Sequence, residues 1–152
     1  MEKEKTIEVL NTLITINNDR IEGYETAAKE TEEQDLKVLF GQFSSTSQKC
    51  KDDLIIEVSK LGGIPAEGTK TIGKFFRVWM DVKSALTGKD RKVILNSCEF
   101  GEGVAKDTYK KVLGNDLDNL NAEQQIMIQA QHILLAADRD KVISMKNKLV
   151  EA

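Results

Sequence analysis

Apolar residues recur along this chain at alternating three- and four-residue spacing, which is the period of a helix that buries one face. The first such segment runs from about Thr6 to Glu30, and the second runs from Glu32 to about Leu61. Thr31 and Gln34 predict a capping box at the start of the second segment, and Gly62-Gly63 predicts its end. The inner faces expected for these two helices comprise Ile7, Leu10, Ile14, Asn17, Ile21, Tyr24, Ala28, Leu36, Phe40, Phe43, Ser47, Cys50, Leu54 and Leu61.

The second half of the chain shows the same pattern after a longer connection. Residues from about Ile72 to Leu86 have helical spacing and predict a short helix inside that connection. A third long helix is expected from Asp90, a residue type that caps helix starts, to Leu113-Gly114. Asn121 with Gln124 predicts a cap for a fourth helix that runs from about Ala122 to Val150. The apolar positions expected on the inner face of the fourth helix are Ile126, Ile133, Ala137 and Ile143.

The order of these helices predicts the fold class. Four long helices joined by a short turn, a long crossover and another short turn indicate an all-α, ferritin-like antiparallel four-helix bundle. The long crossover, between helices 2 and 3, carries the short extra helix. No linker or low-complexity tract interrupts the 152 residues, so we expect a single domain over residues 1–152. The first and third helices also show a weak repeat that suggests two related hairpins, and its matched pairs are Leu10 with Leu95, Asn17 with Glu102 and Tyr24 with Tyr109.

One acidic residue lies where the helical pattern calls for a buried side chain. Glu102 shares a helix face with Cys98, Ala105 and Tyr109. A buried carboxylate needs a metal, a hydrogen-bonding Tyr or Asn, or a cation beside it. We expect a buried polar layer, in which Tyr hydroxyls and the Asn amide bond the carboxylate, made of Asn17, Tyr24, Glu102 and Tyr109.

Composition narrows the class of partner. The net charge of −3 comes from intermixed acidic and basic residues, which argues against binding to a nucleic-acid backbone. No apolar run approaches the about 20 residues that span a bilayer, and the charged start MEKEKT has no apolar segment behind it, so we expect a cytoplasmic protein with no membrane partner. Cys50 and Cys98 fall on apolar faces of different helices and are expected to be buried, reduced thiols.

Several separated segments resemble a known family. These segments are INNDRIEGYETAA in the first helix, LGGIPAEGT after the second, RVWMDVKSALTGKDRK in the crossover and ILNSCEFGEG in the third helix. Together they resemble the bacterial four-helix-bundle family classed as domain of unknown function 2383, in the ferritin-like superfamily. The resemblance covers nearly the whole chain. It implies a fold but no function, because the family has no established activity.

A ferritin-like fold suggests a test for metal chemistry. A dinuclear iron or manganese site needs an inward Glu on two helices and a Glu-x-x-His on each of the other two. Here the repeat partner of Glu102 is Asn17, and the only histidine, His132, follows Gln129 in place of Glu. We therefore expect no cofactor, although a single iron or manganese site remains an alternative, with Glu22, Glu99, Glu102, Asp138, Asp140 and His132 as its candidate ligands.

Two classes of function remain open from the sequence. The first is a non-catalytic bundle that acts by self-association, as a homodimer, or by binding a protein partner, with a stress-response role that the family resemblance loosely implies. The candidate partner surface is the aromatic part of the crossover, with Phe75, Phe76 and Trp79. The second is a degenerate ferritin-like metal-binding protein that uses Glu102 and neighbouring carboxylates. Neither a phosphate-binding glycine loop nor a Cys-x-x-Cys pair is present, so no catalytic residue is assigned.

Overall fold

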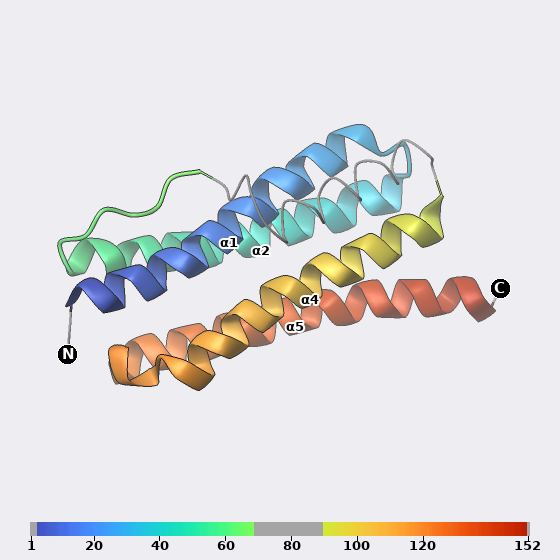
Figure 1. The fold of residues 1–152 in the computed structure, drawn as a ribbon. Coiled ribbons are helices and arrows are strands. Elements are labelled where there is room, and N and C mark those ends of the chain that lie inside the picture. Colours follow the sequence, from blue (N-terminus) through green and yellow to red (C-terminus); the bar gives the residue numbers. More distant parts are fainter. Residues whose placement is uncertain (1–2, 69–89, 152) are drawn as a thin grey trace.

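The computed structural model describes residues 3–68 and 90–151 of the chain. Its described part is built from four long helices: α1 (Lys3–Glu30), α2 (Gln34–Lys60), α4 (Arg91–Asn115) and α5 (Ala122–Glu151), with a 3-10 turn, η1 (Leu117–Asn119), between the last two. Figure 1 shows α1 with α2 and α4 with α5 as two hairpins that lie against each other. The all-α four-helix bundle predicted from the sequence is confirmed. The predicted short helix from Ile72 to Leu86 lies outside the described residues.

Helix starts follow from their capping residues in two of three predicted cases. Asp90 accepts hydrogen bonds from the backbone N–H groups of Lys92 and Val93, which fixes the start of α4. Asn121 and Gln124 bond each other's backbone N–H groups at 2.8 and 3.0 Å, the capping box expected for α5. The box predicted at Thr31 is wrong, because α2 begins at Gln34 with Glu33 at the cap position and no side-chain cap bond.

The two glycines after α2 end that helix for different reasons. Gly62 has a φ of 77°, in the left-handed region that side chains rarely adopt. Its neighbour Gly63 returns its N–H to the carbonyl of Val58, as in a Schellman motif. A Cβ on Gly63 would lie 2.8 Å from Cδ1 of Ile7, so this glycine also lets the turn approach α1 closely.

The core has an apolar cluster toward each end of the bundle and a polar layer between them. One cluster centres on Leu10, Leu13 and Leu54, with Ile128 and Leu135 from α5. The other holds the aromatic rings of Tyr24, Phe40 and Phe43, packed on Ile94, Leu95 and Val142. Helices pack more closely within each hairpin than across the two hairpins. Large side chains therefore fill the space between the hairpins.

The inner face predicted for α5 is wrong by part of a helical turn. Ile126 and Ile133 are 67% and 68% exposed, and Ala137 also lies on the surface. The buried row consists of Gln124, Ile128, Gln131, Leu135, Asp138 and Val142. α5 is apolar on two faces, so its periodicity alone did not identify the one that packs inward. In α1, likewise, Ile7, Ile21 and Ala28 are only partly buried, while the row through Leu10, Asn17 and Tyr24 is fully buried.

Among the described residues, no helix combines the length and the apolar character needed to cross a bilayer.

Candidate functional site

The centre of the polar layer is Arg20, a residue that sequence reasoning missed. It lies three positions after Asn17 and four before Tyr24, so helical geometry turns all three side chains to the same inner face of α1. The Arg20 side chain is fully buried. An arginine in such a position needs compensating charge and acceptors, because an isolated buried cation is very costly.

All four long helices contribute to the surroundings of the guanidinium. Glu102 of α4 binds it with both carboxylate oxygens, at 3.0 Å from Nε and 2.7 Å from Nη2. Asp138 of α5 accepts a further hydrogen bond, also from Nη2, at 3.1 Å, and the hydroxyl of Ser47 on α2 accepts a hydrogen bond from Nη1. The two-point contact with Glu102 uses the planar geometry that distinguishes Arg from Lys.

Aromatic side chains close this ion cluster on one side. The Tyr24 hydroxyl donates to Oε2 of Glu102 at 2.7 Å, so the same carboxylate is held by a cation and by a neutral donor. The guanidinium carbon lies 5.5 and 5.8 Å from the ring centroids of Tyr24 and Phe43, within cation–π range. Tyr24 in turn packs against Phe40 and Phe43, with centroids 5.6 and 5.1 Å away.

A second hydrogen-bonded chain lies next to the ion cluster. The Asn17 amide donates to the Tyr109 hydroxyl at 2.8 Å, and that hydroxyl donates to Oε1 of Gln131 at 2.7 Å. Gln131 then donates to the backbone carbonyl of Cys50 at 3.1 Å. The repeat positions thus pair crosswise, because Asn17 bonds Tyr109 while Glu102 bonds Tyr24.

Burial and charge shift the pKa values of these groups. Burial alone would lower the pKa of Arg20. The effects of Glu102, Tyr24 and Asp138 together are larger and raise the pKa above its ordinary value, so the guanidinium stays charged. Burial raises the pKa of Asp138, and Arg20 opposes that shift only in part. Burial also raises the pKa of Tyr24 well above its ordinary value, with Glu102 adding to the effect. These tyrosine and arginine side chains therefore keep their protons at neutral pH.

The cysteine thiols are protected from reaction by the same burial. Burial raises the pKa of Cys50 to about 11, and it raises the pKa of Cys98 further still. Both cysteines are buried and unpaired with each other. Because the thiolate is the reactive form of cysteine, neither group has the character of a nucleophile.

The structure brings the four residues expected in the polar layer to one region, where Asn17, Tyr24, Glu102 and Tyr109 are each at most 1% exposed. Only Tyr24 bonds the Glu102 carboxylate as expected, because Asn17 and Tyr109 bond each other. Four residues that were not expected there complete the layer: Arg20, Ser47, Gln131 and Asp138. Of the partners left open for Glu102, the structure places a cation and a tyrosine hydroxyl beside it. The available signal was the spacing of Arg20, which continues the buried row of α1.

The candidate metal ligands do not gather at one point. Glu22 is exposed, Glu99 lies 2.6 Å from Lys146, and His132 is on the flank of α5 near Lys106 and Lys110. Glu102 and Asp138 do meet, but the cation between them is Arg20. Within residues 3–68 and 90–151, no group of three or more His, Cys, Asp or Glu side chains could hold a metal ion. This donor set does not fit the dinuclear centre of ferritin-like oxidases.

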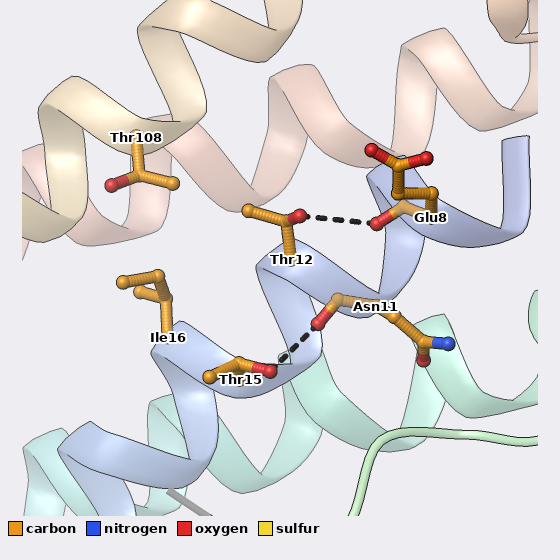
Figure 2. A pocket seen from close by; sticks show the side chains of 6 residues that line it. All are labelled: Glu8, Asn11, Thr12, Thr15, Ile16 and Thr108. Atoms are coloured by element: carbon orange, nitrogen blue, oxygen red, sulfur yellow. Dashed lines mark hydrogen bonds between the residues drawn. The ribbon is translucent and has the colours of Figure 1, made fainter. Parts of the chain in front are cut away.

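A pocket of about 400 Å³ lies between α1 and α4, and none of the residues of the polar layer lines it (Figure 2). Three of its lining residues are threonines whose hydroxyls bond their own helix: Thr12 to the Glu8 carbonyl, Thr15 to the Asn11 carbonyl, and Thr108 to the Val104 carbonyl. The Asn11 amide is also engaged, with the backbone of Ile64 and Ala66. The lining therefore offers mainly methyl groups and already bonded polar atoms, and its one carboxylate, Glu8, lies 3.6 Å from the ammonium group of Lys5.

Comparisons with known proteins agree with the fold and add no activity. A family model described as "Domain of unknown function (DUF2383)" matches residues 5–115. The chain is also similar to the crystal structure of a conserved hypothetical protein, rv2844, from Mycobacterium tuberculosis, with a TM-score of 0.72 and 13% sequence identity. That similarity covers 96% of this chain and 94% of the other, and at this identity it shows a shared fold alone. The sequence matches none of the curated proteins.

Proposed function

The chain belongs to the DUF2383 family, and we propose that it is a non-catalytic, ferritin-like bundle that acts through its surface, by associating with a second copy or with a protein partner. The observation that carries this proposal is the closed ion cluster around Arg20. The only buried cation of the layer, among the described residues, is bonded by two carboxylates and a hydroxyl. Neither Glu102 nor Asp138 is left available to a substrate or an ion.

This arrangement supports a structural role for the layer. A buried arginine that needs an acid from α4 and another from α5 makes one mutual position of the two hairpins more favourable than others. Buried polar groups of this kind can fix helix register, sometimes at a cost in stability. The function would then depend on the shape and chemistry of the outer helix faces.

The competing proposal is a degenerate metal-binding protein, and one fact favours it. Glu102 and Asp138, two of the carboxylates suggested by the sequence, do approach a common point. Arg20 occupies that point with its own positive charge, which a divalent ion would have to displace into the core. Coulomb repulsion and the loss of three ionic hydrogen bonds both oppose such an exchange.

Metal analysis separates the two proposals. Protein purified without affinity-tag metal is incubated with ferrous or manganous ions, desalted and measured by elemental analysis beside Glu102→Gln as control. We expect sub-stoichiometric metal in both proteins and no shift of the melting temperature on adding metal. Stoichiometric iron or manganese in the wild type that is lost in Glu102→Gln would overturn the proposal in favour of a metal site.

The proposal extends to location and physiology. Two free, buried cysteines are typical of proteins kept in a reducing compartment, which supports a cytoplasmic location. A role in a bacterial stress response is implied by the family resemblance. The aromatic surface of Phe75, Phe76 and Trp79 remains a candidate partner site, and these residues lie outside the described part of the chain.

A further inference from the structure

The outer face of α5 carries an apolar stripe that no part of the described structure covers. Ile126 and Ile133 are 67% and 68% exposed, and Leu134 beside them is 39% exposed. Ala130 and Ala137 are also exposed and complete the row at alternating four- and three-residue spacing. Residues 124–137 contain no Asp, Glu, Lys or Arg. We call Ile126, Ala130, Ile133 and Ala137 the α5 stripe.

Packing of the bundle does not require this stripe. The buried rows of α2 and α5 have the same spacing, so that Leu36 corresponds to Gln124 and Leu54 to Val142. By the same correspondence the stripe matches positions on the outer face of α2 that are mostly polar: Val38, Gln42, Ser45 and Lys49. The same place in the fold is therefore filled with solvent-compatible residues in one hairpin and with an apolar row in the other.

The order of side chains along the stripe is self-complementary when two copies run antiparallel. Large and small residues alternate as Ile, Ala, Ile, Ala. With a two-fold axis between Ala130 and Ile133, each Ile of one copy faces an Ala of the other, as an isologous interface requires. A parallel pair would instead place Ile against Ile and Ala against Ala, which leaves the helices in contact at two points and apart at two others.

Charged residues lie at both ends of the stripe and differ between the two orientations. Glu123 lies in the first turn of α5, while Asp140 and Lys141 follow the stripe at its far end. In the antiparallel register Asp140 lies opposite the partner's Glu123, and Lys141, the next residue, brings a positive charge to this acidic pair. The pair lies at the amino-terminal end of the partner's α5, where the helix dipole favours negative charge. In a parallel pair Glu123 would face Glu123, and Lys141 would lie at the other end of the stripe.

We propose that two copies of this chain form a symmetric dimer through antiparallel contact of their α5 stripes. This inference rests on the proposed function, since it identifies self-association as the mode of action and α5 as the surface. It differs from the sequence-based expectation, which placed the partner surface on Phe75, Phe76 and Trp79. A single helix pair buries little area for a dimer, so the dissociation constant should lie in about the micromolar range.

The first test compares two identical substitutions on the full-length chain. Ile133→Glu places a charge at the centre of the stripe, and Ile56→Glu places one on α2, where Ile56 is 52% exposed. Sedimentation equilibrium, from about micromolar to about millimolar chain, gives the dimer constant of each protein. We expect Ile133→Glu to weaken the dimer by about 30-fold or more and Ile56→Glu to leave it unchanged. Equal melting temperatures by circular dichroism establish that both variants are folded.

The second test determines the orientation of the two copies. Chains with Ile126→Cys are mixed with chains carrying Ala137→Cys under mild oxidation, and each variant is also oxidised alone. We expect a disulfide-linked dimer mainly in the mixture, because antiparallel contact puts position 126 opposite position 137. The native Cys50 and Cys98 are buried and do not compete. Linked dimers that form as readily from Ile126→Cys alone would overturn the antiparallel arrangement.

The outcomes separate this inference from the broader proposal. A wild type that stays monomeric at millimolar concentration, or a dimer that Ile133→Glu leaves intact, would overturn the α5 interface. Neither result touches the metal analysis, which tests the non-catalytic proposal independently. Loss of the dimer in Ile133→Glu alone, with cross-linking mainly in the mixture, would establish the interface.

Discussion

The two hairpins have matching buried rows, yet they contribute opposite charges to the ion cluster around Arg20. The first hairpin supplies the cation, Arg20, and its counterpart at the matching position of α4 is the small Ala105. The second hairpin supplies both acids: Glu102, which matches Asn17, and Asp138, which matches Cys50. The interior is therefore complementary between unlike halves, so two copies of one hairpin could not reproduce it.

The outer faces of the hairpins differ in the opposite sense. α2 presents mainly polar residues to solvent, and α5 presents the Ile and Ala of the α5 stripe at corresponding positions. The inside thus favours pairing of one hairpin with the other within a chain, whereas at these matched outer positions the continuous apolar row lies on the second hairpin. The two hairpins thus share a backbone arrangement, but they differ in their buried side chains and in the side chains that α2 and α5 present to solvent.

Replacement of the buried cation, Arg20, should lower the free energy of unfolding more than any other change considered. Arg20→Met keeps much of the side-chain volume but leaves Glu102 and Asp138 buried without a counterion. We expect a loss of about 3–5 kcal/mol in the free energy of unfolding, measured by urea denaturation. The control is Arg91→Met, because Arg91 is a partly exposed arginine paired with Glu33 and Asp35 at 2.7 and 2.6 Å. That control should cost at most about 1 kcal/mol, and equal losses would contradict the buried network.

Neutralising the main acid should have the next largest effect. Glu102→Gln preserves shape, and its one oxygen can still accept from Tyr24 and from Nε of Arg20, but the charge is lost and the amide NH2 group meets the Nη2 donor at the second point of contact. We expect a loss of about 1–3 kcal/mol, smaller than for Arg20→Met because Asp138 remains as a counterion. The same urea series measures it, and an unchanged or increased stability would show that the ion pair contributes nothing net.

Capping of α5 should have a moderate effect. Asn121 is bonded to the N–H of Gln124 at 2.8 Å, whereas the corresponding start of α2 has no side-chain cap bond. We expect Asn121→Ala to lower the free energy of unfolding by about 1 kcal/mol. Glu33→Ala at the start of α2 tests the contrast as far as capping is concerned, although it also removes an ion pair with Arg91. An unchanged free energy of unfolding in Asn121→Ala would show that the capping box of Asn121 and Gln124 does not stabilise the protein.

Neutralising Asp138, the second acid bonded to Arg20, should change the free energy of unfolding least at neutral pH. The size of this change should depend on pH. The pKa of Asp138 is raised by burial, so the folded state keeps its proton at pH values where the unfolded state has lost it. Its contribution to stability is then largest below the ordinary pKa of about 4 and declines as the pH rises through the raised value. The free energy of unfolding of Asp138→Asn should therefore rise relative to that of the wild type as the pH rises over that range. At pH 7 the two values should differ by at most about 1 kcal/mol. Urea titrations at several pH values measure the difference, and a variant that loses ground as the pH rises would contradict the raised pKa.

Much of the fold could be predicted from the sequence because local signals and helical period agreed. Asp90, Asn121 and Gly62 marked helix ends that the structure confirms. The Thr31 box was wrong, because its hydroxyl bonds the N–H of Glu33 at 3.3 Å in the turn and does not cap the helix. The register of α5 was also wrong, since two apolar faces compete on that helix and only tertiary packing selects the inner one.

The site was harder to predict because its central residue breaks a general expectation. Arginine is normally assigned to the surface, and only its place in the row of Asn17 and Tyr24 could have indicated burial. Gln131 depended on the α5 register, so the error there hid it, and Asp138 was considered only as a candidate metal ligand and not as a partner of a buried cation. Glu102 was found because its helix has a single apolar face, on which an acid is conspicuous.

The most direct test of the interior is a double-mutant cycle between Arg20 and Glu102. Urea denaturation gives the free energy of unfolding of the wild type, Arg20→Met, Glu102→Gln and the double variant. If the two side chains form one closed network, the double variant should lose less than the two single losses together, with a coupling of about 1–3 kcal/mol. Losses that simply add would contradict the account, because they would mean that the cation and the acid act independently in the bundle.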